Sequence, residues 1–472
     1  METYKIYAAG SFTDTADYYE LKASYDNKAF ALVGRASAED LNRCIDLAVG
    51  VEAELAGMPL YERSQILTRI ADDMAGQRSR LATLLCLEAG KPMKYSIGEV
   101  DRAIQTFRIA AAETLRQPGE YLRLDWTPSG KGKEGWVRYF PLGAMAGISP
   151  FNFPLNLSVH KIAPAIAAGN PIILKPASQT PVTMLELAGI IDKTTLPKGA
   201  LSVLPMDRVT GNQLVTDPRL KMLSFTGSPE VGWRMKQTAG TKRVVLELGG
   251  NAGVIVDESA DLNLALQKCL IGGFAYSGQV CIHTQRIYVL SSVFSSFSSA
   301  YAEMVQQLKY GDPLDPATDI SVMIDDGQAS RVESWINEAI ESGARVLCGG
   351  MRKGRYVEPT VLTSTRPAMK VCTEEVFGPV VIIEPVASFE DGIAMINDSQ
   401  YGLQAGIFTR RTDHVSMAFE KLKVGGVIVN DVPTFRVDHM PYGGVKNSGI
   451  GREGVRYAMM EMMEPRLLVK EF

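Results

Sequence analysis

Apolar residues recur at helical spacing from residue 38 to residue 117. Ser37 to Asp40 resembles a helix-capping box, with aspartate in place of glutamate. Pro59 favours the start of a second helix that ends near Gly90, and a third helix is predicted from about Glu99 to Gln117. This part of the chain is therefore predicted to be helical.

The spacing changes to strict alternation after residue 120. Leu122, Leu124 and Trp126 alternate with charged residues, and a polar loop leads to a second apolar stretch, Trp136–Phe140. This pattern predicts a hairpin with a long polar tip. Because two strands alone seldom bury enough surface to be stable, we expect the hairpin to protrude from the rest of the fold.

From residue 141 onward, short apolar runs alternate with helical segments such as Val182–Ile191. The runs have the length and composition of buried parallel strands. Those before Gly249 are 144–148, 172–175, 201–204, 222–225 and 244–246, and those after it include 253–256, 286–290, 380–383 and 427–430. Repeated strand–helix units predict doubly wound sheets, and the Gly249-Gly250 break indicates two α/β domains.

The composition is that of a large globular protein. The 472 residues are enough for about three domains, and 22% of them are charged. A formal net charge of −4 with no long basic run argues against a nucleic-acid partner. The most apolar stretch, Ile162–Leu174, is interrupted by proline and glycine, and the first residues lack a secretory pattern. We therefore expect a soluble cytoplasmic protein without a membrane partner.

The six cysteines are scattered without CxxC pairs, and only four histidines occur, so neither disulfides nor a metal site are expected. A single reactive thiol remains a candidate. Cys281 is the best placed cysteine, because it follows the glycine-containing segment 277–280 and directly precedes a strand. The alternative is a buried core cysteine, which is how we interpret Cys44 and Cys269 on apolar helix faces.

Two further residues have side chains suited to chemistry at a cysteine. Glu247 ends an apolar strand, where a carboxylate costs desolvation energy unless it has a partner or a function. Asn152 lies between two phenylalanines on a turn after a strand and could donate a hydrogen bond to an oxyanion. Taken alone, each has an ordinary alternative: a strand-end carboxylate can reach water, and a turn asparagine can satisfy its own backbone.

A phosphate site is predicted at Phe225–Gly232, where a strand leads into a helix. Lys175, at the end of another strand, would add a cation. The segment lacks the GxGxxG pattern, so a helix cap without a ligand is the alternative. Two glycine-rich aromatic turns, 374–379 and 441–453, permit the backbone to approach a ligand closely.

Seven motifs, in this order along the chain, together resemble the aldehyde dehydrogenase superfamily. They are PFNFP, KPAS, FTGS, ELGGN, GQVC, EEVFGP and PYGGVKNSGIGRE. The resemblance implies an α/β fold with a Rossmann-like cofactor domain (1–120 and 141–248), an α/β catalytic domain (249–455) and a small β oligomerisation element (121–140 and 456–472). Edge strands in that element would need cover from a neighbouring subunit, so a homodimer or homotetramer is expected.

The resemblance also implies a role for each candidate side chain. Cys281, as the thiolate, would attack a small-molecule aldehyde, while Asn152 and the Cys281 backbone N–H would hold the oxyanion. After hydride transfer, Glu247 would activate water to hydrolyse the thioester. Relatives that transfer the acyl group to coenzyme A commonly lack this glutamate, so a free carboxylic acid is the expected product. A non-catalytic binding protein and a thiol esterase without redox chemistry are the alternatives.

The expected cofactor is NAD or NADP. By resemblance, Glu375 would bind the nicotinamide ribose, Phe377 and Phe151 would lie beside the nicotinamide, and Gly227 and Ser228 would face the pyrophosphate.

Cofactor preference is predicted from a single position. NAD-preferring relatives often have a glutamate three residues after the lysine that Lys175 matches, and this glutamate repels a 2′-phosphate. Here that residue is Ser178, which has no charge. We therefore expect NADP to be accepted, with NAD also possible.

The substrate prediction depends on Asn430–Met440, which resembles the branch of lactaldehyde, phosphonoacetaldehyde and succinate-semialdehyde dehydrogenases. A polar, partly cationic tunnel would favour small hydroxy- or acid-bearing aldehydes. Arg108 and Arg436 could equally be ordinary surface charges. The candidates for the tunnel and the innermost pocket are Arg108, His160, Val280, Ile282 and His439.

Overall fold

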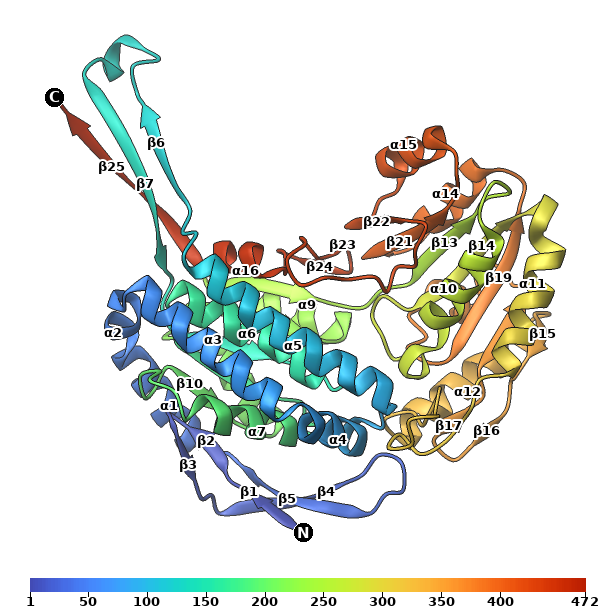
Figure 1. Cartoon of the computed structure of the whole chain (residues 1–472), viewed down its shortest axis with the longest axis horizontal. Coiled ribbons are helices and arrows are strands. Elements are labelled where there is room, and N and C mark those ends of the chain that lie inside the picture. Colours follow the sequence, from blue (N-terminus) through green and yellow to red (C-terminus); the bar gives the residue numbers. More distant parts are fainter.

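The computed structural model describes residues 1–472 and contains two large sheets (Figure 1). The first has eight strands in the order β24-β12-β11-β8-β9-β10-β2-β3. Its five central strands are parallel, and antiparallel strands are added at both edges. The strands are β2 (Ile6–Ala8), β3 (Ser11–Thr13), β8 (Met145–Ile148), β9 (Ile172–Lys175), β10 (Leu201–Val203), β11 (Met222–Thr226), β12 (Arg243–Glu247) and β24 (Gly449–Ile450).

The second sheet has seven strands in the order β15-β18-β19-β14-β13-β21-β22. Only the pairing of β15 with β18 is antiparallel, so this sheet too is built from strand–helix units. The strands are β13 (Ala252–Val256), β14 (Thr284–Leu290), β15 (Arg345–Cys348), β18 (Thr360–Thr363), β19 (Val380–Val386), β21 (Gln404–Phe408) and β22 (Gly426–Val429).

The helices cover the faces of these sheets, and α3, α5 and α6 pack together over the first sheet (Figure 1). None of the helices combines the length and the apolar character needed to cross a bilayer. The helices are α1 (Ala38–Gly50), α2 (Glu52–Gly57), α3 (Leu60–Gly76), α4 (Arg78–Ala89), α5 (Met93–Thr114), α6 (Pro154–Ala168), α7 (Val182–Ile191), α8 (Arg208–Thr216), α9 (Pro229–Thr238), α10 (Leu262–Phe274), α11 (Ser291–Gln306), α12 (Asp326–Glu341), α13 (Lys370–Thr373), α14 (Phe389–Asn397), α15 (Thr412–Lys421) and α16 (Val455–Glu461), with 3-10 turns η1 (Pro128–Gly130) and η2 (Ala275–Gly278).

The helical stretch differs in detail from the prediction. The capping box at Ser37 is present, with Asp40 as its second partner. The helix predicted from Pro59 to Gly90 is instead two helices, because the chain breaks at Gln77. The predicted third helix begins earlier than expected, directly after the proline that follows α4, because the fixed φ of proline suits the start of a helix.

The chain leaves the first sheet after β12 and returns to this sheet near the C-terminus. β24 pairs antiparallel with β12, so that Gly449 lies opposite Glu247. α16 then packs against α5 and α6. The glycine-rich turn 441–453 therefore belongs to the first sheet in space, although it follows the second sheet in sequence.

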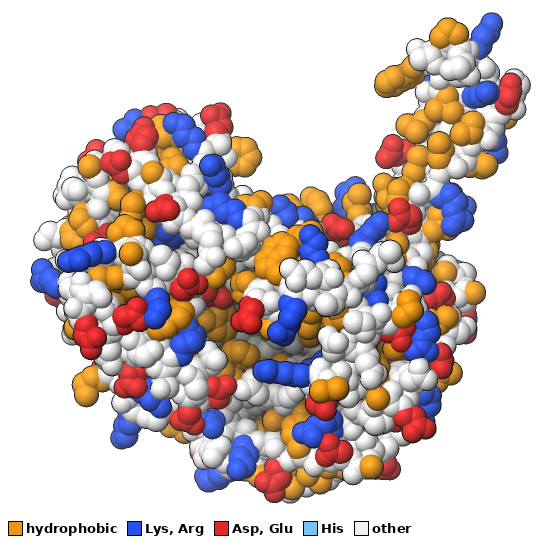
Figure 2. Space-filling view, turned by 180° about the vertical axis from the view of Figure 1, so that it is seen from behind, with side chains coloured by type: hydrophobic (Ala, Val, Ile, Leu, Met, Phe, Trp, Pro, Cys, Tyr) orange, Lys and Arg blue, Asp and Glu red, His pale blue; other side chains and the backbone are white.

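The predicted hairpin is confirmed and forms part of a projecting arm (Figure 1). Its strands β6 (Gly119–Arg123) and β7 (Lys133–Pro141) are joined by the C-terminal strand β25 (Met463–Glu471) in the order β25-β7-β6. Apolar side chains line the arm in the space-filling view (Figure 2). The most exposed of them are Trp126 at 90% and Phe472 at 82%.

Several short strands were not predicted. A three-stranded sheet near the N-terminus consists of β1 (Glu2–Tyr4), β5 (Ala29–Arg35) and β4 (Asp17–Lys22), and two two-stranded ribbons pair β16 (Arg352–Lys353) with β17 (Tyr356–Val357) and β20 (Tyr401–Gly402) with β23 (Val445–Lys446).

Candidate active site

A cleft of about 610 Å³ brings together residues from seven separate stretches of the chain. Its volume is in the range of ordinary cofactor and ligand sites. The lining residues include Phe151, Asn152, Gly227, Ser228, Glu247, Cys281, Glu375 and Phe377. All three predicted catalytic side chains therefore face one cleft, together with most of the residues predicted for the cofactor.

The turn before Cys281 has an unusual backbone. Tyr276, Ser277 and Gly278 have φ of 50°, 54° and 67°, the left-handed region that residues other than glycine rarely adopt. Tyr276 Oη donates to the carbonyl of Ala89 at 2.8 Å, and Ser277 Oγ donates to another backbone carbonyl at 2.8 Å. The surrounding structure therefore holds the turn in place, and the turn directs Cys281 into the cleft.

The Cys281 thiol opens onto the cleft among apolar neighbours. Val280 and Ile282, on either side of it, pack with Leu403 and Tyr442. The Sγ atom lies 3.2 Å from Tyr442 Oη. Burial raises the pKa of the Cys281 thiol to about 11, against the smaller opposing effect of the Tyr442 hydrogen bond. The resting thiol is therefore protonated at neutral pH and needs a base before it can act as a nucleophile.

Asn152 lies on the loop between β8 and α6 and is held against the nucleophile turn. Its side-chain Nδ2 donates to the backbone carbonyl of Gln279 at 3.0 Å. Gln279 is itself fixed, because its Oε1 accepts a hydrogen bond from the N–H of Ile324 at 2.9 Å. The Asn152 amide and the segment that carries Cys281 are thus in direct contact.

Glu247 ends β12 with its carboxylate buried and free. Neither Oε1 nor Oε2 has a hydrogen-bond partner. Burial raises the pKa of Glu247 well above its usual value, and the negative charge of Glu453 raises it further. A buried carboxylate with no partner is costly in a folded protein, so this one is a candidate for a chemical function.

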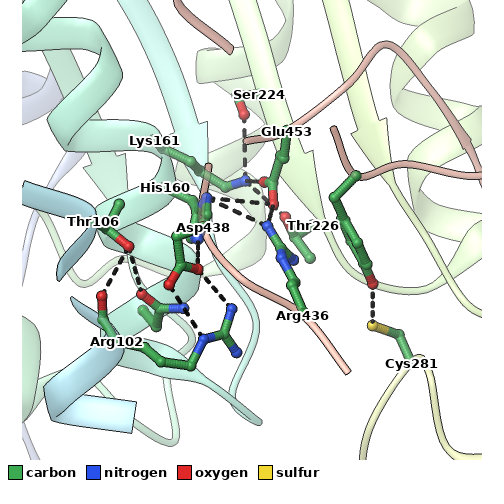
Figure 3. A network of polar contacts seen from close by, with 12 residues as sticks. Arg102, Thr106, His160, Lys161, Ser224, Thr226, Cys281, Arg436, Asp438 and Glu453 are labelled. Atoms are coloured by element: carbon green, nitrogen blue, oxygen red, sulfur yellow. Dashed lines mark hydrogen bonds and ion pairs between the residues drawn. The ribbon is translucent and has the colours of Figure 1, made fainter. Parts of the chain in front are cut away.

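Behind Tyr442 lies a buried arginine that the sequence left ambiguous (Figure 3). The Arg436 guanidinium carbon is 3.6 Å from the centroid of the Tyr442 ring, and the side chain is only 4% exposed. Nη2 donates to Glu453 Oε2 at 2.9 Å and to His160 Nδ1 at 3.3 Å, whereas the buried Nε has no partner. Arg436 is therefore not a surface charge.

The same network fixes the protonation of His160 (Figure 3). Because an arginine can only donate, His160 Nδ1 is an acceptor and the proton is on Nε2, which donates to Asp438 Oδ1 at 2.7 Å. Burial, with the nearby Arg436 charge, lowers the pKa of His160, so the ring is neutral. Asp438 also accepts from Arg102 Nη2 at 2.6 Å.

Glu453 completes the network with a second cation. Lys161 Nζ lies 3.4 Å from Glu453 Oε1 and donates to Thr226 Oγ1 at 2.7 Å. Burial alone would raise the pKa of Glu453, but the charges of Lys161 and Arg436 outweigh it and lower this pKa to about 2. Sequence reasoning missed Lys161, although a single lysine in the otherwise apolar α6 is a usable signal.

On the opposite side of Cys281, Glu375 and two phenylalanines line the cleft. Glu375 Oε1 accepts the N–H of Gly250 at 2.9 Å. Burial raises the pKa of Glu375 to about 7, and the Gly250 N–H opposes that rise. Phe151 and Phe377 pack edge to face with ring centroids 5.9 Å apart.

The far end of the cleft has the features of an anion site. α9 begins directly after Ser228, whose side chain makes no capping bond, so N–H groups of its first turn remain available. Lys175 ends β9, where burial and then the nearby Arg208 charge lower its pKa. Ser178 is exposed, and its carbonyl accepts from the Tyr19 hydroxyl at 3.0 Å. The free N–H groups of α9 fit the anionic part of a dinucleotide, whereas Lys175 and Ser178 are not among the residues that line the cleft.

The structure places two of the predicted tunnel residues outside the cleft that holds Cys281. Arg108 lies on the outer face of α5, where it pairs with Asp72 at 3.4 Å, because the adjacent Phe107 takes the buried face. His439 is exposed beside Arg456 and Tyr457 rather than near Cys281. His160 is fully buried and contacts Arg436 instead of open space.

Two open α/β sheets with a dinucleotide-sized cleft and a cysteine within it define the class of cofactor-dependent oxidoreductases that work through a thiol. Comparison with known sequences gives the family. The pattern of the Aldehyde dehydrogenase family matches residues 12–468. The 3-sulfolactaldehyde dehydrogenase of Priestia aryabhattai is 41% identical over 470 residues, which cover 99% of this chain and 98% of that protein.

Solved structures agree with the sequence comparison. Aldehyde dehydrogenase 21 from Physcomitrella patens, in complex with the reaction product succinate, is 42% identical with a TM-score of 0.99, covering 100% of this chain and 98% of that one. Glyceraldehyde-3-phosphate dehydrogenase GapN from Methanocaldococcus jannaschii, complexed with NADP, is 36% identical with a TM-score of 0.93, covering 97% and 100%.

The chain belongs to the aldehyde dehydrogenase family. Its activity is the oxidation of an aldehyde to a carboxylic acid with NAD or NADP. This activity takes the place of the two alternatives, a non-catalytic binding protein and a redox-free esterase.

Proposed function

We propose that Cys281 forms the covalent bond to the aldehyde. The thiolate attacks the carbonyl carbon, and the Asn152 amide, with the Cys281 N–H, stabilises the negative charge that develops on oxygen. The supporting observation is that Cys281, Asn152 and Glu247 line the same cleft. Bound NAD or NADP supplies the hydride acceptor that turns the thiohemiacetal into a thioester.

Glu247 is the base for this chemistry. Its raised pKa makes it a better proton acceptor than an exposed carboxylate, and its two free oxygens can bind a water molecule. It takes the proton from the thiol in the first step, releases that proton to solvent, and then takes a proton from water in the hydrolysis step. The product is then the free carboxylic acid.

The cofactor is held by residues on both sides of Cys281. Glu375 binds the ribose of the nicotinamide half, Phe151 and Phe377 pack beside its ring, and Gly227 and Ser228 lie along the pyrophosphate. These roles are supported by the shared cleft lining and by the free first turn of α9.

NADP is accepted because residue 178 is a neutral serine instead of a glutamate that would repel the 2′-phosphate. Lys175 and Arg208 are the cations near that end, and Ser178 adds a neutral hydroxyl. Ser178→Glu puts a carboxylate there, and we expect it to lower kcat/KM with NADP relative to NAD by about 10- to 100-fold, since like charges brought together cost several kcal/mol. Near-exclusive use of NAD by the unaltered enzyme would contradict this proposal.

The substrate is a small hydroxy- or acid-bearing aldehyde. Arg436 supports this, because its unpaired Nε is buried next to Tyr442, which contacts the nucleophile. An anionic or hydroxylated substrate group would provide the acceptor that this donor lacks. The relatives that act on 3-sulfolactaldehyde or carry bound succinate point in the same direction.

A substrate panel tests this function. We expect reduction of NADP, followed by absorbance, with lactaldehyde and succinate semialdehyde to exceed that with hexanal in kcat/KM. Best turnover with hexanal would contradict the polar tunnel. No reduction with any aldehyde and either cofactor would contradict the whole proposal.

We propose three functional parts, and they follow the two sheets and the arm except that β24 and α16 pack with the first sheet. Residues 1–120 and 141–248 bind the cofactor, 249–455 carry the nucleophile, and 121–140 with 456–472 join subunits into a homodimer or homotetramer. The exposed apolar side chains of the arm support the last role. We also propose a cytoplasmic location, since all six cysteines are free thiols.

A further inference from the structure

A buried ion pair that the proposed chemistry does not use joins the turn between α4 and α5 to α5 itself. Lys91 Nζ bonds to Glu99 Oε2, and both side chains are completely buried. A buried ion pair is weak evidence for stability, because well-packed apolar residues often stabilise a fold more. The importance of this pair therefore depends on the other contacts that Lys91 and Glu99 make.

Glu99 fixes the loop that carries Asn152. α6 begins at Pro154, and the N-cap residue before it, Phe153, has no side chain that can cap the helix. Glu99 Oε1 accepts instead the N–H groups of Leu155 at 3.0 Å and Asn156 at 3.1 Å. The first turn of α6, directly after Asn152, is thus attached to α5 through one carboxylate.

Lys91 contacts the loops of both proposed catalytic groups. Its Nζ lies 3.8 Å from the centroid of the Phe153 ring and 4.6 Å from that of Tyr276. Phe153 is the residue after Asn152, and Tyr276 is the first left-handed residue of the turn that leads to Cys281. One ammonium group therefore lies against both loops, whose aromatic rings are themselves 6.2 Å apart.

We propose that Lys91 and Glu99 are positioning residues that set the Asn152 amide against the Cys281 turn. They contact neither substrate nor cofactor, and they act through Phe153, Tyr276 and the start of α6. This inference rests on the proposed roles of Asn152 and Cys281. Its chemical consequence is confined to the oxyanion, so it affects kcat more than the KM for the cofactor.

The test is a double-mutant cycle with Asn152. We expect Lys91→Met to lower kcat by about 10- to 100-fold, because misplacing a catalytic group by about 1 Å has effects of this size. The KM for NADP should change less than twofold. In the Asn152→Ala background the same change should lower kcat less than twofold further, because the group that it misplaces is already gone.

Matched variants separate positioning from folding. Lys94→Met, one turn further along at an exposed ion pair with Asp319, should leave kcat unchanged. Glu99→Gln keeps an oxygen acceptor for the α6 N–H groups but removes the charge beside Lys91, so it tests the pair even if Lys91→Met does not fold. A similar fall in kcat is expected for it, again reduced in the Asn152→Ala background.

Two results would overturn the inference. One is an unchanged kcat in folded Lys91→Met or Glu99→Gln, and the other is a full additional loss in the Asn152→Ala background, which indicates a general structural role. Failure of the proposed function has a different signature: Asn152→Ala would then retain full activity by itself.

Discussion

The two buried glutamates Glu247 and Glu453 interact electrostatically, yet their surroundings have opposite effects on their pKa values. Glu453 is bound by Lys161 and Arg436, and these charges lower its pKa to about 2. Glu247 has no hydrogen-bond partner, and burial together with the charge of Glu453 raises its pKa. Carboxylates whose pKa values are pushed apart in this way commonly divide the tasks of a site.

The comparison shows what each carboxylate can do. Glu453 stays ionised and holds two cations in place, so its role is to organise the network. The pKa of Glu247 is raised by burial, so its carboxylate is suited to accept a proton as a base. The charge on Glu453 contributes to the raised pKa of Glu247, which means that the organising residue also tunes the reactive one.

Replacing the free carboxylate should have the largest effect. Glu247→Gln is expected to lower kcat by about 10²- to 10⁴-fold, because it removes general-base catalysis of thioester hydrolysis. Rapid mixing with aldehyde and NADP measures this. A burst of reduced cofactor followed by a very slow steady state would show that hydrolysis depends on Glu247 more than hydride transfer does, and an unaltered steady state would remove the distinction between the two glutamates.

Replacing the paired carboxylate should instead destabilise the fold. Glu453→Gln leaves Lys161 and Arg436 buried without their counter-charge, a change that costs about 3–5 kcal/mol in comparable buried pairs. Thermal unfolding is expected to give a clearly lower Tm. An unchanged Tm would mean that the network is more hydrated than the burial of its side chains indicates.

The opposite change in stability is expected at Glu247. Its pKa in the folded state is above the unfolded value, so its contribution to stability is present at low pH and is lost as the pH rises through the folded-state pKa. Glutamine does not ionise, so Glu247→Gln avoids the cost of a buried charge at neutral and alkaline pH. The Tm of the variant should therefore be higher than that of the unaltered enzyme at these pH values. Equal Tm values at every pH would contradict the raised pKa.

The coupling of the two glutamates predicts a shift in the pH profile. Because the base must be ionised, kcat is expected to fall as the pH falls through the pKa of Glu247. In Glu453→Gln the neighbouring negative charge is absent, so this pKa should decrease and the acid limb should move to lower pH. A limb that stays in place would show that another group controls it.

The smallest effect is expected at Arg108, which the sequence predicts for the tunnel and the structure places in an exposed ion pair. Arg108→Ala removes an exposed pair with Asp72, and such pairs contribute little. We expect kcat/KM to remain within about twofold for acid-bearing aldehydes. A larger loss specific to these substrates would restore Arg108 to the tunnel and weaken the role given to Arg436.

Much of the fold could be predicted, because local apolar patterns specify its central elements. β9 and α7 have the bounds that the apolar runs predict. The N-terminal strands could not be predicted in this way. β2, for example, has three residues and is stabilised by pairing with β10, nearly two hundred positions away, so no local pattern signals it.

Some residues of the candidate site could likewise be predicted from the sequence, and others could not. Cys281, Glu247 and Asn152 are candidates because each lies at the end of an apolar strand or on a turn beside one, but only the resemblance of the ordered motifs gives each of them a role. Arg436 and Arg108 have equally ordinary neighbours in sequence, and only the packing of α5 and of the segment before β23 determines that one is buried and the other exposed. Burial of charged side chains is a property of the assembled fold.

The most direct test of the account is the mass of a trapped intermediate. Glu247→Gln is incubated with succinate semialdehyde and NADP at alkaline pH, where the Cys281 thiol can ionise without Glu247. The reaction is quenched in acid and analysed as the intact protein and as peptides. We predict one succinyl group per chain, located on Cys281, with one equivalent of reduced cofactor formed. Reduced cofactor without any adduct, or an adduct on another cysteine, would contradict covalent catalysis at Cys281.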